Sequence, residues 1–208
     1  MMFISYKIVF IVGELMKASR SYLFCFLSLI FFIGSIFSRD TMIMNRKLKV
    51  NTGTHISYLI AAVMRTDGPV LELGCGDFST PILHSLCSLK KRLLVTAESD
   101  KKWMRLFSDL SRDWHQFIAV KNFDDWSNVG TDVHWSVVLI DHAPEPRRLM
   151  DLKRLRNNTD IFVLHDSQCP HLYKDYVSTF KYSYSSKRYE VRTTLVSDVI
   201  DVSKFFQD

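Results

Sequence analysis

Apolar and polar positions follow one another along most of the chain in blocks that predict strands and helices in turn. Short continuous apolar runs are typical of parallel strands buried on both faces, and apolar residues three or four positions apart indicate helices. The expected strands are 70–73, 92–96, 117–120, 135–140 and 161–164. The expected helices are 54–64, 81–89, 100–110, 147–156 and 172–180. Two last segments, 182–184 and 188–195, are expected to form an antiparallel closing pair.

This order predicts an α/β fold: a Rossmann-like, doubly wound, mostly parallel sheet with helices on both faces and an antiparallel closing strand. The chain of 208 residues can bury one sizeable core, so we expect one such domain over residues 41–208. In sheets of this kind the ligand lies at the carboxyl ends of the strands. The candidate site residues are therefore sought there.

Residues 1–40 do not fit this pattern. The run 22–37 is almost wholly apolar and follows Lys17 and Arg20. It is slightly short for a bilayer-spanning helix of about 20 residues, and a basic stretch before an apolar one also builds a secretory signal. We expect residues 1–40 to be a cleaved signal peptide or an uncleaved membrane anchor, which places the protein at a membrane or in the secretory pathway. Basic residues on both flanks leave the sidedness open.

The net charge of +5 does not change the picture, because the basic residues are scattered as short pairs instead of forming a stripe. We expect no nucleic-acid partner. The four cysteines show no CxxC pair and no zinc-binding spacing, so neither a disulfide framework nor a structural zinc site is indicated.

The strongest local signal is a strand that runs into a glycine-bearing turn, with the sequence LELGCGDFST at 71–80. Glycines at 74 and 76 remove side chains that would keep a ligand off the backbone, and the following helix offers free N–H groups. Glu98 follows the second strand at about the spacing where nucleoside-binding folds place an acid for ribose hydroxyls. Dinucleotide-binding folds more typically have glycine where this chain has Ser79, so a ligand without a pyrophosphate is favoured.

The segment Glu72-Leu73-Gly74-Cys75-Gly76 resembles motif I of class I S-adenosylmethionine-dependent methyltransferases, and Glu98 lies where that family has its ribose-binding acid. The resemblance covers residues 70 to about 167 and implies S-adenosylmethionine as the cofactor. It implies that Glu72 orders the turn and the methionine end, and that the region after the third strand flanks adenine. The implied cofactor-binding residues are Glu72, Gly74, Cys75, Gly76, Ser79, Glu98, Asp124, Asp125 and Trp126.

The chain is also similar to a group of methyltransferase-like proteins whose chemistry is unassigned. The shared segments are Ser79-Thr80-Pro81, Asp100-Lys101-Lys102-Trp103, Asp141-His142-Ala143-Pro144 followed by Arg147-Arg148, and His165-Asp166-Ser167. This likeness supports the fold and names no substrate.

Methyl transfer from a sulfonium is an in-line displacement, so the protein supplies positioning and, for a hydroxyl acceptor, a base. The residues that end the fourth and fifth strands are the candidate catalytic groups: Asp141, His142, His165 and Asp166. Either histidine is a candidate general base, because imidazole titrates near neutral pH, although strand-end histidines are often structural.

Asp141 and Asp166 resemble the positions that bind a divalent cation in catechol-type O-methyltransferases. The third ligand in that family is an asparagine, and this chain has Ser167 there. The alternative is that the two acids pair with Arg147 or Arg148 and bind no metal.

The DPPY or NPPF signature of amino-directed nucleic-acid methyltransferases is absent, which favours a hydroxyl or carboxyl acceptor on a small molecule or glycan. Two alternatives to a methyltransferase stay open at this point. One is an NAD-type oxidoreductase, and the other is a non-catalytic Rossmann-like binding module anchored at a membrane.

Overall fold

The computed structural model describes residues 53–185 and 190–206. The expected signal or anchor segment at 1–40 and the boundary at residue 41 lie outside the described residues. Within those residues, no helix combines the length and the apolar character needed to cross a bilayer.

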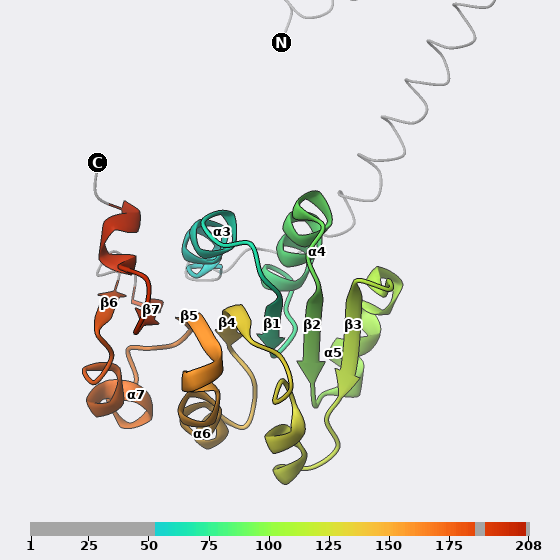
Figure 1. Ribbon diagram of the computed structural model, residues 1–208. Helices are drawn as coiled ribbons and strands as arrows, with labels where there is room; N and C mark the ends of the chain where they lie inside the picture. Colours follow the sequence, from blue (N-terminus) through green and yellow to red (C-terminus); the bar gives the residue numbers. More distant parts are fainter. Residues whose placement is uncertain (1–52, 186–189, 207–208) are drawn as a thin grey trace, which may run out of the picture. The chain divides into compact units, whose positions relative to one another are not determined.

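The described residues form a seven-stranded sheet with the strand order β3-β2-β1-β4-β5-β7-β6 (Figure 1). All neighbouring strands are parallel except at β7, which runs antiparallel to both β5 and β6. The predicted Rossmann-like fold with an antiparallel closing strand is therefore confirmed. The strands are β1 (Val70–Leu73), β2 (Leu94–Glu98), β3 (His115–Ala119), β4 (Trp135–Ile140), β5 (Thr159–Leu164), β6 (Tyr182–Ser185) and β7 (Thr194–Ser197).

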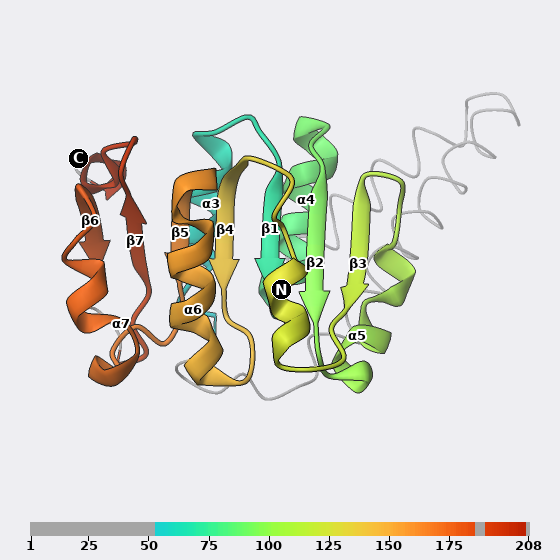
Figure 2. The same cartoon turned by 60° about the horizontal axis from the view of Figure 1, so that its bottom comes forward.

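Helices cover both faces of the sheet, with α3 and α4 on one face and α6 and α7 on the other (Figures 1 and 2). The short helix α5 packs against β2 and β3 at one side of the sheet. The helices are α3 (Ile56–Met64), α4 (Ser79–Lys90), α5 (Lys101–Leu106), α6 (Glu145–Leu155) and α7 (Pro170–Val177). Turns of 3-10 helix follow at Ser108–Leu110, Asp124–Asn128, Arg156–Asn158 and Val202–Phe206.

Alternate residues of each central strand enter two different core layers. In β1, Leu71 and Leu73 pack with the side chains of α6 and α7, whereas Val70 packs with those of α3 and α4. Every residue of β1, β2 and β4 is buried. This burial on both faces explains why these strands are mostly apolar, and the polar residues that they contain, such as Glu72, are buried as well.

Several expected strands have other bounds in the structure, and β2 and β7 differ most. β2 begins at Leu94 instead of residue 92, because the N–H of Arg92 donates to the carbonyl of Cys87 at the end of α4 and not to a neighbouring strand. β7 spans Thr194–Ser197, so the expectation of a strand over 188–195 was wrong. Its position is fixed by pairing with β5, in which Leu164 lies opposite Thr194.

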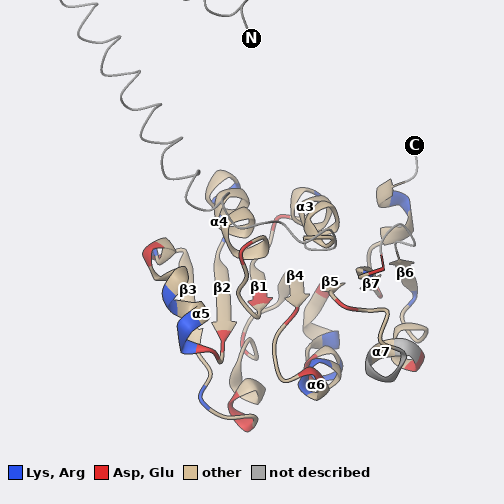
Figure 3. Cartoon of the chain, turned by 180° about the vertical axis from the view of Figure 1, so that it is seen from behind, with Lys and Arg blue, Asp and Glu red and all other residues tan. Residues whose placement is uncertain are grey.

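Charged residues are distributed unevenly over the elements. Lys and Arg are dispersed over several helices, whereas acidic residues occur at the carboxyl ends of β1, β2 and β4 (Figure 3). The strand ends are where ligands bind in doubly wound sheets, so these acids mark the edge that holds the candidate site.

Candidate functional site

The turn between β1 and α4 places one glycine against the protein and the other against open space. Gly74 has a φ of +94°, and a Cβ added there would lie 2.7 Å from the backbone of Asp141 and His142. A Cβ added at Gly76 would meet only the Ser79 Oγ, at 3.5 Å. The fold therefore requires glycine at 74, while glycine at 76 keeps a space open beside the backbone.

Glu72, which lies in β1 just before this turn, stabilises it by hydrogen bonds. It is fully buried in β1, and its carboxylate accepts hydrogen bonds from the hydroxyls of Thr80 (3.0 Å) and Thr96 (2.7 Å). The Thr80 Oγ1 accepts in turn from the N–H of Gly76 (2.9 Å). Burial raises the pKa of Glu72 to about 7. Glu72 therefore orders the turn through Thr80, as the resemblance implied, and it does not line the hollow described below.

Glu98 ties the same turn to the end of β2. Its carboxylate accepts from the N–H groups of Cys75 (3.0 Å), Ser99 (2.6 Å) and Asp100 (2.7 Å), and the residue is 7% exposed. The Cys75 thiol (3.6 Å) and the Ser99 hydroxyl (3.4 Å) donate to it as well, so groups of the chain itself occupy most of its acceptor positions. The structure thus assigns Glu98 a part in fixing the loops, in addition to the ribose contact that was expected.

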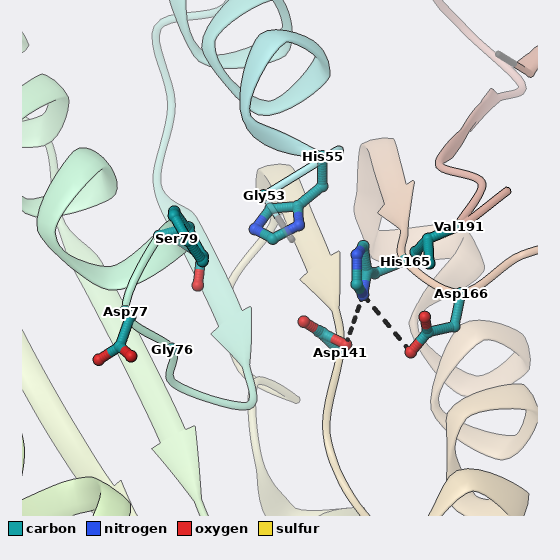
Figure 4. A pocket seen from close by; sticks show the side chains of 10 residues that line it. Gly53, His55, Gly76, Asp77, Ser79, Asp141, His165, Asp166 and Val191 are labelled. Carbon is teal, nitrogen blue, oxygen red and sulfur yellow. Dashed lines mark hydrogen bonds and ion pairs between the residues drawn. The ribbon is translucent and has the colours of Figure 1, made fainter. Parts of the chain in front are cut away.

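A hollow of about 280 Å³ opens at the carboxyl ends of β1, β4 and β5 (Figure 4). It brings together five of the predicted site residues from three separate segments: Gly76, Ser79, Asp141, His165 and Asp166. It is also lined by residues that sequence reasoning missed: Gly53, His55, Asp77, Phe78 and Val191. The carboxyl ends of the strands therefore form a site, as the fold class predicted.

The two acids of this hollow share their partners. Asp141 lies 3.2 Å from Arg148 Nη2 and 3.0 Å from His165 Nδ1. Asp166 lies 3.1 Å from Arg148 Nη1 and 3.4 Å from His165 Nδ1. Pairing of the acids with Arg148, one of the two alternatives, is thus observed. Arg147 instead pairs with Asp151, at 3.0 Å.

These contacts decide the charge of His165 in the structure. Burial lowers its pKa, but hydrogen bonds to Asp141 and Asp166 outweigh this and raise the pKa to about 9. The hydrogen bond from His165 also holds the pKa of Asp166 well below its usual range. At neutral pH His165 is therefore protonated in this arrangement, and it can act as a base only after it has lost that proton.

His55 is placed quite differently, although its ring faces that of His165. The two ring centroids are 4.5 Å apart, with the planes at 79°. Burial and the neighbouring His165 lower the pKa of His55 to about 4, so this imidazole is neutral at neutral pH. A single sequence carries no signal for His55, because it lies at the start of a helix far along the chain from the strands that complete the hollow.

Ser167 does not complete the catechol-type metal site. Its hydroxyl lies 2.8 Å from the hydroxyl of Thr194 in β7, and it does not line the hollow. The set formed by Asp141, Asp166 and Ser167 is therefore not assembled in this structure, because Arg148 and Thr194 hold its members.

His142 follows Asp141 but lies in the core. It is 1% exposed, its Nε2 is 2.9 Å from an Asp151 oxygen, and its ring lies 4.2 Å from that of Trp126. Burial lowers its pKa. His142 does not line the hollow, so the structure gives it a structural position and not the expected place beside the acids.

The region expected to flank adenine is also packed inward. Trp126 is 1% exposed and packs on His142, so its ring has no open face on which a base can stack. Asp125 accepts a hydrogen bond from the N–H of Asn122 (3.1 Å) and so closes its own turn, while Asp124 is exposed. The expectation that Trp126 stacks on adenine does not agree with this packing.

No protein-family model and no curated protein matches the sequence. Solved structures do match. A proposed O-methyltransferase from Klebsiella pneumoniae has a TM-score of 0.56 and 12% identity over 75% of this chain and 83% of its own. A proposed caffeoyl-CoA O-methyltransferase from Staphylococcus aureus has a TM-score of 0.56 and 10% identity over 93% and 99%. Human methyltransferase-like protein 13, in complex with S-adenosylhomocysteine, has a TM-score of 0.53 and 13% identity over 73% and 83%.

Proposed function

We propose that this chain, which has the fold of class I S-adenosylmethionine-dependent methyltransferases, is an enzyme of that class. We propose further that it methylates a hydroxyl or carboxyl group of a small molecule or glycan. The observation that carries the proposal is the turn at 74–76, which leaves space beside Gly76 at the edge of a hollow lined by Asp141, His165 and Asp166. A fold alone does not fix a function, so this site carries the argument.

The residues of the turn fit the cofactor. Gly76 and Ser79 line the hollow, and Phe78 at the N-cap of α4 supplies no side-chain cap to the helix. The first turn of α4 carries no acid either, so this helix end suits the carboxylate of the methionine end. Glu72 and Glu98 hold the turn in place from either side. When bound, S-adenosylmethionine would supply a methyl group on a sulfonium.

A second hollow, of about 320 Å³, supports a polar acceptor. It is lined mostly by hydroxyl and amide side chains together with Arg192, and Ser167 joins it to the end of β5. Hydroxyls and one cation suit an acceptor that carries hydroxyl or carboxyl groups. For a hydroxyl acceptor, the described groups that line the hollow and can take the proton are Asp141 and Asp166, and His165 can do so once it has lost its own proton. Two of the similar structures are described as O-methyltransferases, which agrees with this acceptor class.

We also propose that residues 1–40 direct the chain to a membrane or into the secretory pathway. The support for this is the apolar run at 22–37 with its basic flank. Carbonate extraction of cells that make the full chain tests the proposal. Retention in the membrane pellet indicates an anchor, and secretion of a shortened chain indicates a cleaved signal. Recovery of the full-length chain in the soluble fraction would contradict both.

Calorimetric titration of the full chain in a mild detergent tests the enzymatic proposal. We expect S-adenosylmethionine and S-adenosylhomocysteine to bind at one site per chain, and NAD to give no heat. Binding of NAD alone would replace the proposal with an oxidoreductase. No binding of any of the three would favour a non-catalytic binding module.

A further inference from the structure

His55 is buried without the partners that an imidazole normally has. It is 4% exposed, and neither ring nitrogen has a hydrogen-bond partner among the residues that the structure describes. Buried polar groups in folded proteins are nearly always satisfied, and an unsatisfied one costs free energy. The ring lines the hollow on the side opposite Asp141, and its centroid lies 4.5 Å from that of His165 (Figure 4). A ligand or ion that binds in the hollow is therefore expected to contact a ring nitrogen of His55.

Three side chains converge there from different elements. His55 precedes α3, Asp141 follows β4, and His165 follows β5. One ligand atom from each lies within 4.8 Å of the other two. Ligand atoms around a tetrahedral ion with bonds of 2.0–2.2 Å lie about 3.4 Å apart, so binding would bring the most distant pair closer by at most about 1.4 Å.

A cation in this cluster would take the place of a proton. Asp141 and Asp166 both contact the guanidinium of Arg148 and the ring of His165, so an ion that binds His165 displaces the proton that the two acids hold there. Asp166 also lies 3.4 Å from His165 Nδ1. Histidines that bind metals usually donate their second ring N–H to a carboxylate, and Asp166 is placed to accept it.

We propose that His55, Asp141 and His165 bind one divalent transition-metal ion of the Zn²⁺ type in this hollow. Two imidazoles and one carboxylate favour such an ion over Mg²⁺, which prefers oxygen ligands. This ligand set differs from the one formed by Asp141, Asp166 and Ser167. Its nitrogen ligands come from His55 and His165, and it does not need the Ser167 hydroxyl that Thr194 holds.

Three protein ligands leave a position on the ion open toward the hollow. An acceptor hydroxyl bound there would have its pKa lowered, which prepares its oxygen to attack the methyl group. This catalytic part rests on the proposed methyltransferase function. Binding of the metal does not rest on it.

Calorimetric titration of the full chain with ZnCl₂, after removal of metals with EDTA, tests the proposal. We expect one site per chain that MgCl₂ does not fill. Loss of a residue outside the coordination shell typically weakens metal binding by roughly 10–100-fold. His55→Ala and His165→Ala should each weaken Zn²⁺ binding by more than this. His55→Ala should keep its fold, because the ring has no hydrogen bonds to lose, and thermal unfolding checks this.

His134→Ala is the matched control. His134 also pairs with a carboxylate, since its Nε2 lies 2.7 Å from an Asp160 oxygen. It precedes the amino end of β4, whereas the hollow lies at the carboxyl end. It should bind Zn²⁺ like the wild type. The proposal is overturned if the wild type binds no Zn²⁺ at one site, or if His55→Ala binds it unchanged. Tight Mg²⁺ binding that is lost in Asp166→Asn and kept in His55→Ala would instead place the ion on the two carboxylates.

A titration with S-adenosylhomocysteine on the same samples separates the two proposals. Cofactor binding with no Zn²⁺ site would remove only the metal. A Zn²⁺ site that depends on His55, without cofactor binding, would remove only the methyltransferase.

Discussion

Two pairs of acids at the carboxyl ends of the strands are held in opposite ways, one pair beneath the turn at 74–76 and the other in the hollow. On the side of β1 and β2, Glu72 and Glu98 are buried, and hydroxyls and N–H groups of the chain itself fill their carboxylates. On the side of β4 and β5, the side chains of Asp141 and Asp166 are 24% and 30% exposed and are balanced by charged partners. The first arrangement fixes a backbone, whereas the second leaves charged groups that an arriving ligand can rearrange. The cofactor is expected at the fixed side and the chemistry at the adjustable side.

The largest effect should come from breaking the fixed side at Gly74. In Gly74→Ala the new Cβ lies 2.7 Å from the backbone of Asp141 and the residue keeps a φ of +94°. Overpacking and backbone strain together should lower the free energy of unfolding by about 3 kcal/mol or more. Urea unfolding measures this. An unchanged unfolding midpoint would mean that the turn does not pack against the end of β4.

A smaller effect is expected from the buried acid of the fixed side. The pKa of Glu72 in the folded chain is about 7, above its usual 4.5. The stabilisation by its protonated form is therefore fully present below pH 4.5 and is lost as pH rises through 7. The loss amounts to about 3 kcal/mol at most. Unfolding curves at several pH values should show this decline in the wild type and lack it in Glu72→Gln, and equal slopes in the two proteins would contradict the assignment.

The smallest effect should appear at Ser167, beside the adjustable side. Ser167→Ala removes the hydrogen bond to Thr194 and should cost about 1 kcal/mol of unfolding free energy. It should leave Zn²⁺ binding unchanged, because Ser167 is not among the proposed ligands. A large loss of metal affinity in this variant would indicate that Ser167 is a ligand, as in the catechol-type set, and would contradict the proposed ligands.

The difference between the two sides also explains what the sequence could predict. Strands β1 and β4 have the predicted bounds, because burial on both faces makes their sequences mostly apolar. The turn at 74–76 could be predicted because the spacing of its glycines is a local feature of the sequence. The position of β7 was not predicted, because pairing with β5 and not the local pattern sets it.

The adjustable side depends on contacts that no local pattern shows. Asp141 and His142 are adjacent, yet Asp141 lines the hollow and His142 is buried against Asp151. Trp126 was expected to stack on adenine because it follows Asp124 and Asp125 after the third strand, but its side chain is buried in the core. His55 joins the site only because α3 packs on the same face of the sheet as α4. Tertiary contacts decide which of these residues reach the hollow, so only the structure separates the candidate site residues from the buried ones.

We propose that the cofactor binds in the open space beside Gly76. Calorimetric titration of S-adenosylhomocysteine into the wild type and into Gly76→Val measures whether it does. The new side chain meets little of the protein, since a Cβ there touches only the Ser79 Oγ, so the variant should fold as stably as the wild type. The account predicts one site in the wild type and a loss of at least about tenfold in affinity, or about 1.4 kcal/mol, in Gly76→Val. Equal affinity in the two proteins would contradict it.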